Sequence, residues 1–276
     1  MTTISVQNNA AALTALQNLN RTSDQLNQVQ EQISTTLAVA KPSDNPIVWA
    51  AAQGQQHSIN GLSAVTQSLN CASSISDVAL AAGQQVADLL TQMKQDALSA
   101  QDPQLDTPSR AALNTDFTGL LHRITTALSS ASFDGANLLD GSSGNMSFLA
   151  TADATQSITM PAENLSLGGG IITVGATSSI STAAAASAMT AQIDASIANV
   201  GAALANIGDQ AKLVGAHNTL VQNLSTVLQT GMGALIDADT ASDSARLAAL
   251  NVQQQLSEQS LNIANGMPNV LLSLFR

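Results

Sequence analysis

The chain has 276 residues and a net charge of −11, with only eight basic residues and three histidines. Nucleic-acid binding and attachment to anionic membranes both need a basic surface, so the composition argues against both roles. Aromatic residues make up 2% of the chain and there is a single cysteine. The aromatic-anchored core of a typical enzyme and an internal disulfide are therefore not expected.

The first forty residues predict an amphipathic helix that begins between Ser5 and Asn9 and ends near Ala40. Its apolar residues form a thin stripe: Leu13, Leu16, Leu19, Leu26, Ile33 and Leu37. Three members of the stripe recur every seven residues, which is coiled-coil spacing. Residues 41–46 contain two prolines, which interrupt the helix.

Residues 47–130 predict three further helices: a short one over 48–56, a long one over 60–100, and one capped by Ser109. The long helix carries two interleaved rows with seven-residue spacing, typical of a packed seam: Leu69, Ser76, Gly83, Leu90 and Ala97, with Ala72, Ala79, Val86 and Met93. The helix after Ser109 has its own apolar stripe: Leu113, Phe117, Leu120, Ile124 and Leu128.

The helical period is lost between residues 145 and 181, where turn residues separate short β-branched runs. We predict strands over 147–149, 157–160 and 171–174. From Thr182 the helical period returns, with a predicted seam: Ile197, Val200, Leu204, Ile207, Ala211 and Val214. Three glycines seven residues apart on this helix are predicted to mark close contacts: Gly201, Gly208 and Gly215.

The last forty residues predict an amphipathic helix with an acidic start, since negative charge is favoured at a helix N-terminus. Its apolar positions and the apolar chain end are Leu247, Leu250, Leu256, Ile263, Leu272, Leu274 and Phe275. A lone helix with so thin a stripe is marginal in water. We therefore predict that it pairs with the first helix, and that the two stripes form the assembly surface.

The predicted fold is mainly α: a nested antiparallel helical coiled-coil bundle with paired terminal helices and a small β segment at the turnaround. Residues 1–42 and 236–276 form an inner-core domain. Residues 43–144 and 182–235 form an outer-core helical bundle, and residues 145–181 form a short β-hairpin segment within it.

Sites for chemistry are not predicted. The three histidines, His57, His122 and His217, have no metal-ligand spacing. Asp237 and Asp239 begin like a calcium loop, but the required glycine and terminal glutamate are missing, so helix capping is the better interpretation. We expect no catalytic residue, no cofactor and no metal, and hence no enzyme.

Several runs near both chain ends resemble bacterial flagellins, in the same order and at the same distance from the termini. At the C-terminal end they are Ser244-Ala245-Arg246-Leu247, Ser260-Leu261-Asn262-Ile263-Ala264-Asn265 and Leu271-Leu272-Ser273-Leu274-Phe275-Arg276. At the N-terminal end the run is Asn8-Asn9-Ala10-Ala11-Ala12-Leu13. A further run in the middle of the chain, Phe133-Asp134-Gly135-Ala136-Asn137-Leu138-Leu139, agrees as well. The chain is most similar to the short alphaproteobacterial type, which has no large variable outer domains.

The resemblance implies a structural subunit that polymerises with copies of itself into the flagellar filament used for swimming. It also implies flagellar cap and hook-associated partners, an export chaperone, and secretion through the flagellar type III apparatus without a cleaved signal peptide. No nucleic acid and no membrane insertion are implied. The alternative is a hook–filament junction protein or a coiled-coil adaptor that does not polymerise.

Overall fold

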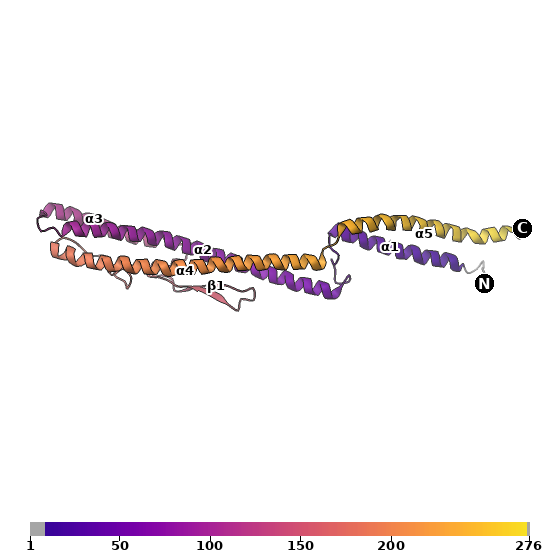
Figure 1. The fold of residues 1–276 in the computed structure, drawn as a ribbon, viewed down its shortest axis with the longest axis horizontal. Coiled ribbons are helices and arrows are strands. Elements are labelled where there is room, and N and C mark those ends of the chain that lie inside the picture. The colour runs from indigo at the N-terminus through magenta and orange to yellow at the C-terminus, as the bar shows by residue number, and fades with distance from the viewer. Residues whose placement is uncertain (1–8, 275–276) are drawn as a thin grey trace. The chain divides into compact units, whose positions relative to one another are not determined.

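The computed structural model describes the backbone from Asn9 to Leu274 and the side chains as far as Met267. Five helices and one two-stranded sheet follow along the chain (Figure 1). Their bounds are α1 (Ala10–Thr35), α2 (Pro46–Ala100), α3 (Thr107–Ser130), β1 (Met146–Leu149), β2 (Ser157–Met160), α4 (Ala183–Ile236) and α5 (Thr240–Leu274). Within this range none of the helices has an apolar stretch that could cross a membrane.

By packing, the chain divides into two units: residues up to His57 together with those from Val227, and residues 58–226. In the first unit α1 and α5 lie side by side and antiparallel (Figure 1). The predicted pairing of the first and last helices is therefore confirmed. The predicted inner-core and outer-core domains refer to the assembled polymer and stay predictions.

Helix α1 is shorter than predicted. The Asn9 side chain caps its start by accepting a hydrogen bond from the Ala12 amide at 3.1 Å. Its end is at Thr35, not Ala40, because Thr36 adopts a left-handed conformation with φ of 58°. The next residue, Leu37, makes a β-bridge with Asp237 and cannot stay helical.

Helix α2 is one continuous helix, so the prediction of a separate short helix over residues 48–56 was wrong. The Asn45 side chain caps its start by accepting hydrogen bonds from the Ile47 and Val48 amides, both at 3.2 Å. Pro46 occupies the first helical position, where its missing N–H has no consequence. All nine residues of the predicted α2 seam are buried, which confirms that seam.

Helix α3 begins two residues before the predicted cap. Asp106 is the flanking extended residue, with φ of −66° and ψ of 156°, and Pro108 lies in the first turn. The prediction that Ser109 caps this helix was wrong. The apolar stripe was correct from Phe117 onwards: Phe117, Leu120, Ile124 and Leu128 are all buried.

Strands β1 and β2 form an antiparallel hairpin in which Met146 pairs with Met160. The predicted third strand over residues 171–174 is a loop. Its Ile172 and Val174 side chains are fully buried, and this alternation imitates a strand. The Thr173 amide donates to Ser196 Oγ of α4 at 3.1 Å, so a helix side chain satisfies this backbone group in place of a neighbouring strand.

Helix α4 buries Val200, Ile207 and Val214 completely, as predicted. The glycine prediction was wrong within the chain, because a Cβ added at Gly201, Gly208 or Gly215 would meet nothing within 4 Å: all three glycines border open space. The close approach is instead at Gly83 of α2, where an added Cβ would overlap the Leu204 side chain.

Candidate assembly surface

The α1–α5 pair is held by backbone hydrogen bonds where the two helices meet the intervening chain. The Ala38 amide donates to the Ile236 carbonyl at 2.7 Å, and the Ala238 amide donates to the Thr36 carbonyl at 3.0 Å. At the other end of the pair Asn9 Nδ2 donates to the Ala264 carbonyl at 2.7 Å. The pair is thus fixed at both ends, which sets the register of the two stripes.

At the end of the pair where Leu37 and Asp237 form a β-bridge (the bridged end), acidic residues stabilise the start of α5. Asp239 caps α5 by accepting a hydrogen bond from the Ser242 amide at 3.1 Å, and Asp243 lies in the first turn. The helix-capping interpretation of this acidic cluster is confirmed. Lys41 forms an exposed ion pair with Glu31 of α1. Its hydrogen bond to Glu31 raises the pKa of Lys41.

The bridged end of the pair is buried. Leu26 and Val29 of α1 form a cluster with Leu250 of α5. Ile33 and Leu247 pack against this cluster and are half-buried. Here the two stripes meet as a small coiled-coil core, which each helix needs because neither is stable alone.

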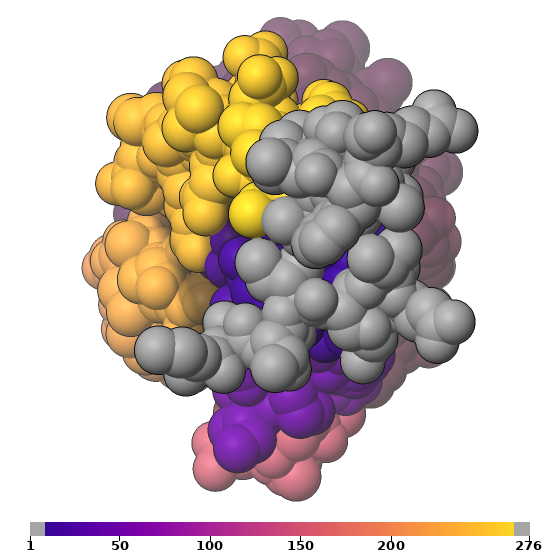
Figure 2. Space-filling view, turned by 90° about the vertical axis from the view of Figure 1, so that its right-hand side faces the viewer, coloured from indigo at the N-terminus to yellow at the C-terminus, as the bar shows by residue number. Residues whose placement is uncertain are grey.

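Towards the other end of the pair several large apolar side chains lie in solvent, while Ala264 stays buried. Leu13 is 54% exposed and Leu16 is 43% exposed on α1, while Leu256 is 64% exposed and Ile263 is 60% exposed on α5. A groove of about 140 Å³ lies between the helices there, lined by Leu256 together with small and polar residues of both helices, including Ala15 and Ser257. Figure 2 views this end of the pair, with α5 (yellow) against α1 (indigo).

The predicted stripe residues therefore fall into three groups. Leu26 and Leu250 are buried, and Leu19, Ile33 and Leu247 are half-buried. Leu13, Leu16, Leu256 and Ile263 are exposed. The side chains of Leu272 and Leu274, and the whole of Phe275, lie outside the described residues.

Sequence reasoning missed three residues of this region. Val29 lies three residues after Leu26 and completes the a/d alternation, so the heptad pattern could have identified it. Val252 and Met267 add to the exposed apolar surface of α5. Val252 lies four residues before Leu256 and Met267 four residues after Ile263, so helical spacing could have identified both.

A metal site is not found in the part of the chain that the structure describes, where no group of three or more His, Cys, Asp or Glu side chains could hold an ion. The distinctive feature is instead a helix pair whose buried contact leaves other large apolar side chains exposed.

Family comparison decides what kind of protein carries this surface. The N-terminal helical region of bacterial flagellins matches residues 6–144, and the C-terminal helical region matches residues 190–275. The chain belongs to the bacterial flagellins. As a flagellin, it is a structural subunit of the flagellar filament, outside the cell, and it polymerises with copies of itself.

Two flagellins are similar to this chain along its whole length. Flagellin FljJ of Caulobacter vibrioides is 46% identical to this flagellin over 99% of both chains. A flagellin of Brucella melitensis is 32% identical, again over 99% of both chains. These relatives are alphaproteobacterial flagellins of similar length, and they do not favour the junction-protein or adaptor alternative.

Solved structures share the fold. A putative flagellar hook-associated protein from Vibrio parahaemolyticus aligns over 70% of this chain and all of its own, with a TM-score of 0.59 and 13% identity. A Bacillus cereus flagellin aligns over 56% of this chain and 88% of its own, with a TM-score of 0.50 and 17% identity. At these identities the likeness concerns the helical architecture alone.

Proposed function

We propose that this flagellin joins the filament by burying the exposed ends of its α1 and α5 stripes against neighbouring subunits. The observation that carries the proposal is the contrast within one helix pair, in which Leu26 and Leu250 are buried while Leu13, Leu256 and Ile263 are exposed. Large apolar side chains gathered on one surface indicate a partner. Leu272, Leu274 and Phe275 belong to the proposed surface by their position after Ile263.

Burial of these exposed apolar side chains contributes a substantial free energy to filament assembly. Fully burying one Leu or Ile side chain is worth about 1.5–3 kcal/mol, so a side chain that is already partly covered gains roughly 1 kcal/mol. Several such side chains per subunit offset the ordering of the helix ends. The contact joins different surfaces of successive subunits and does not close, which produces a helical polymer and not a ring.

Seeded polymerisation tests the proposal. Leu256→Ala removes an exposed side chain of the proposed surface, while Leu98→Ala removes one of similar exposure on α2. We expect Leu256→Ala to raise the critical concentration for filament growth about tenfold, since 1.4 kcal/mol corresponds to a factor of ten. Leu98→Ala should polymerise like the parent chain. An unchanged critical concentration for Leu256→Ala would refute the role of this surface.

Export is the second part of the proposal. We propose that the chain passes unfolded through the flagellar type III apparatus with the help of an export chaperone, and keeps its N-terminus. The thin buried cluster of α1 and α5 supports this, since a pair with few buried contacts opens readily. The intact mass of the subunit recovered from filaments shows whether the N-terminus has been kept. A mass short by an N-terminal segment would contradict the uncleaved route.

A further inference from the structure

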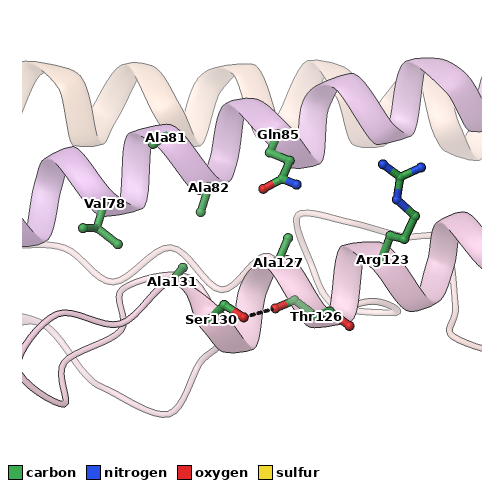
Figure 3. A pocket seen from close by; sticks show the side chains of 9 residues that line it. All are labelled: Val78, Ala81, Ala82, Gln85, Arg123, Thr126, Ala127, Ser130 and Ala131. Carbon is green, nitrogen blue, oxygen red and sulfur yellow. Dashed lines mark hydrogen bonds between the residues drawn. The ribbon is translucent and has the colours of Figure 1, made fainter.

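A groove between α2 and α3 has no occupant among the described residues. Its volume is about 480 Å³. Small and aliphatic side chains face each other across it: Val78 and Ala82 of α2, with Ala127 of α3 and Ala131, which follows the end of α3 (Figure 3). Gln85 and Arg123 lie towards one end (Figure 3). A groove with such short side chains can accept larger ones from another helix.

Arg123 is a cation without a partner in the described part of the chain, where it makes no hydrogen bond or ion pair. Among the described basic residues, Arg21 and Arg246 are likewise without an ion pair, while Lys41, Lys94 and Lys212 each form one. Arg123 also lines an adjoining groove of about 440 Å³ together with Asp96 and Asp116, and it forms an ion pair with neither of them. Its guanidinium is therefore available to a carboxylate from outside the chain.

The outward side of α4 carries an apolar stripe of larger residues. Leu213 is 51% exposed and Leu220 is 59% exposed, and Leu224 follows on the same side. At the start of the stripe the Asp209 side chain is 74% exposed. Its one ion pair, with Lys212 at 3.2 Å, is highly exposed and hence weak. Along the chain direction, the stripe thus has a carboxylate followed by leucines. The α3 side of the groove has a guanidinium followed by small residues.

We propose that the α2–α3 groove receives the outward stripe of α4 from a second copy of this chain, with Arg123 opposite the neighbour's Asp209. The inference rests on the proposed function, because it concerns a second contact between the same subunits. The spacings agree: Ala127 lies four residues after Arg123, and Leu213 lies four residues after Asp209. A helix running in the same direction as α3 brings Leu213 over Ala127 one turn beyond the ion pair.

The direction also fits a helical polymer. Within one chain α3 and α4 both run antiparallel to α2 (Figure 1). A copy displaced sideways without being turned over therefore presents its α4 parallel to α3, as the contact requires. The Lys94–Asp194 ion pair and the Asn70–Asn218 hydrogen bond place Asp209 near the level of Ala79 on α2. The Arg110–Ala100 hydrogen bond places Arg123 near the level of Ala87 on α2. Meeting Arg123 then requires a shift of about 12 Å along the helices, at 1.5 Å per residue.

Cysteine cross-linking tests the contact. In a Cys71→Ser background, Ala127→Cys and Leu213→Cys place one thiol on each side of the proposed interface. We expect a mild oxidant to join subunits into covalent ladders in filaments but not in dilute monomer. Ala127→Cys with Leu98→Cys is the matched control and should give no ladder. Filaments that form normally but show no ladder with Ala127→Cys and Leu213→Cys would overturn the inference.

Charge reversal is the independent test. We expect Arg123→Glu and Asp209→Lys each to raise the critical concentration about tenfold, and the double variant to recover most of the loss. Circular dichroism of the monomers should be unchanged in all three. If the double variant is as defective as the two changes combined, or if neither change affects growth, the pairing is wrong. The terminal-helix proposal fails by a different result, a normal critical concentration for Leu256→Ala, so the two failures are distinguishable.

Discussion

The α2 seam and the α1–α5 pair are both built on seven-residue repeats, yet they are completed to different degrees. Along α2 every predicted seam residue is buried, and Leu69, Val86 and Met93 have no exposed surface. In the α1–α5 pair only a small cluster around Leu26 and Leu250 is buried. A heptad repeat therefore indicates that a helix packs against a partner. The number of partner elements within the chain then determines how much of its apolar stripe is buried.

The difference has a simple cause in the number of contacting elements. Residues on α2 contact α3, the hairpin and α4. For example, Leu149 of β1 donates its amide to Ser68 at 3.0 Å, and Asn218 of α4 donates its side-chain amide to Asn70 at 2.8 Å. Helices α1 and α5 contact mainly each other. Two helices cannot enclose an apolar stripe on all sides, so surface remains for other subunits to bury.

The strongest test of this comparison is deletion of residues 250–276. It removes Leu250 from the buried cluster together with all of the exposed α5 surface. We expect filament growth from seeds to be abolished, while the unit of residues 58–226 keeps its helices. Electron microscopy measures the first effect and far-ultraviolet circular dichroism the second. Normal filaments from the truncated chain would contradict the assembly role of this tail.

A large effect on stability is expected at the α2 seam. Leu90→Ala opens a cavity in a fully buried position, which costs about 2–5 kcal/mol. Urea unfolding of the monomer should show this loss, while Leu256→Ala leaves the monomer nearly unchanged. Equal destabilisation by Leu90→Ala and Leu256→Ala would remove the distinction between the completed seam and the exposed stripe.

Smaller changes in stability are expected at two helical glycines that lie on predicted helices and cannot be told apart from the sequence alone. Gly208→Ala adds a methyl group into open space on a helix and should stabilise the monomer by about 0.5–1 kcal/mol. Gly83→Ala forces the Leu204 side chain to move and should destabilise it by about 1–3 kcal/mol. Thermal unfolding measures both, and the same sign for the two changes would contradict the packing described.

The smallest effect concerns Asp96 of α2. This residue lines the groove of about 440 Å³ beside Arg123, together with Asp116. Burial, followed by repulsion from Asp116, raises the pKa of Asp96. The folded state therefore holds this proton more tightly than the unfolded state, so the stabilising effect of protonation is present at low pH and is lost as the pH rises through the folded pKa. We expect Asp96→Asn to stabilise the monomer at neutral pH and to change little at acidic pH. Urea unfolding at both pH values measures this.

Errors in the sequence reading share a cause. Over residues 171–174 the alternating burial of a strand comes from a loop whose amide at Thr173 bonds to a helix side chain. The expected break after residue 56 is absent, because no residue between Gln56 and Asn60 prevents a helix from continuing. In both cases the conformation depends on neighbouring residues and elements that the local sequence pattern does not include.

The sequence by itself determined that this flagellin is helical, that its two ends pair, and where the α2 seam lies, because heptad spacing and acidic helix starts are local properties of the chain. Only the tertiary structure decided which part of each stripe is buried. That depends on which face of a helix meets a neighbouring element: Leu250 packs against α1, while Leu256, about 120° away around α5 at 3.6 residues per turn, is exposed. The groove beside Arg123 was likewise invisible in the sequence, since its residues come from two helices whose side chains are brought together only by folding.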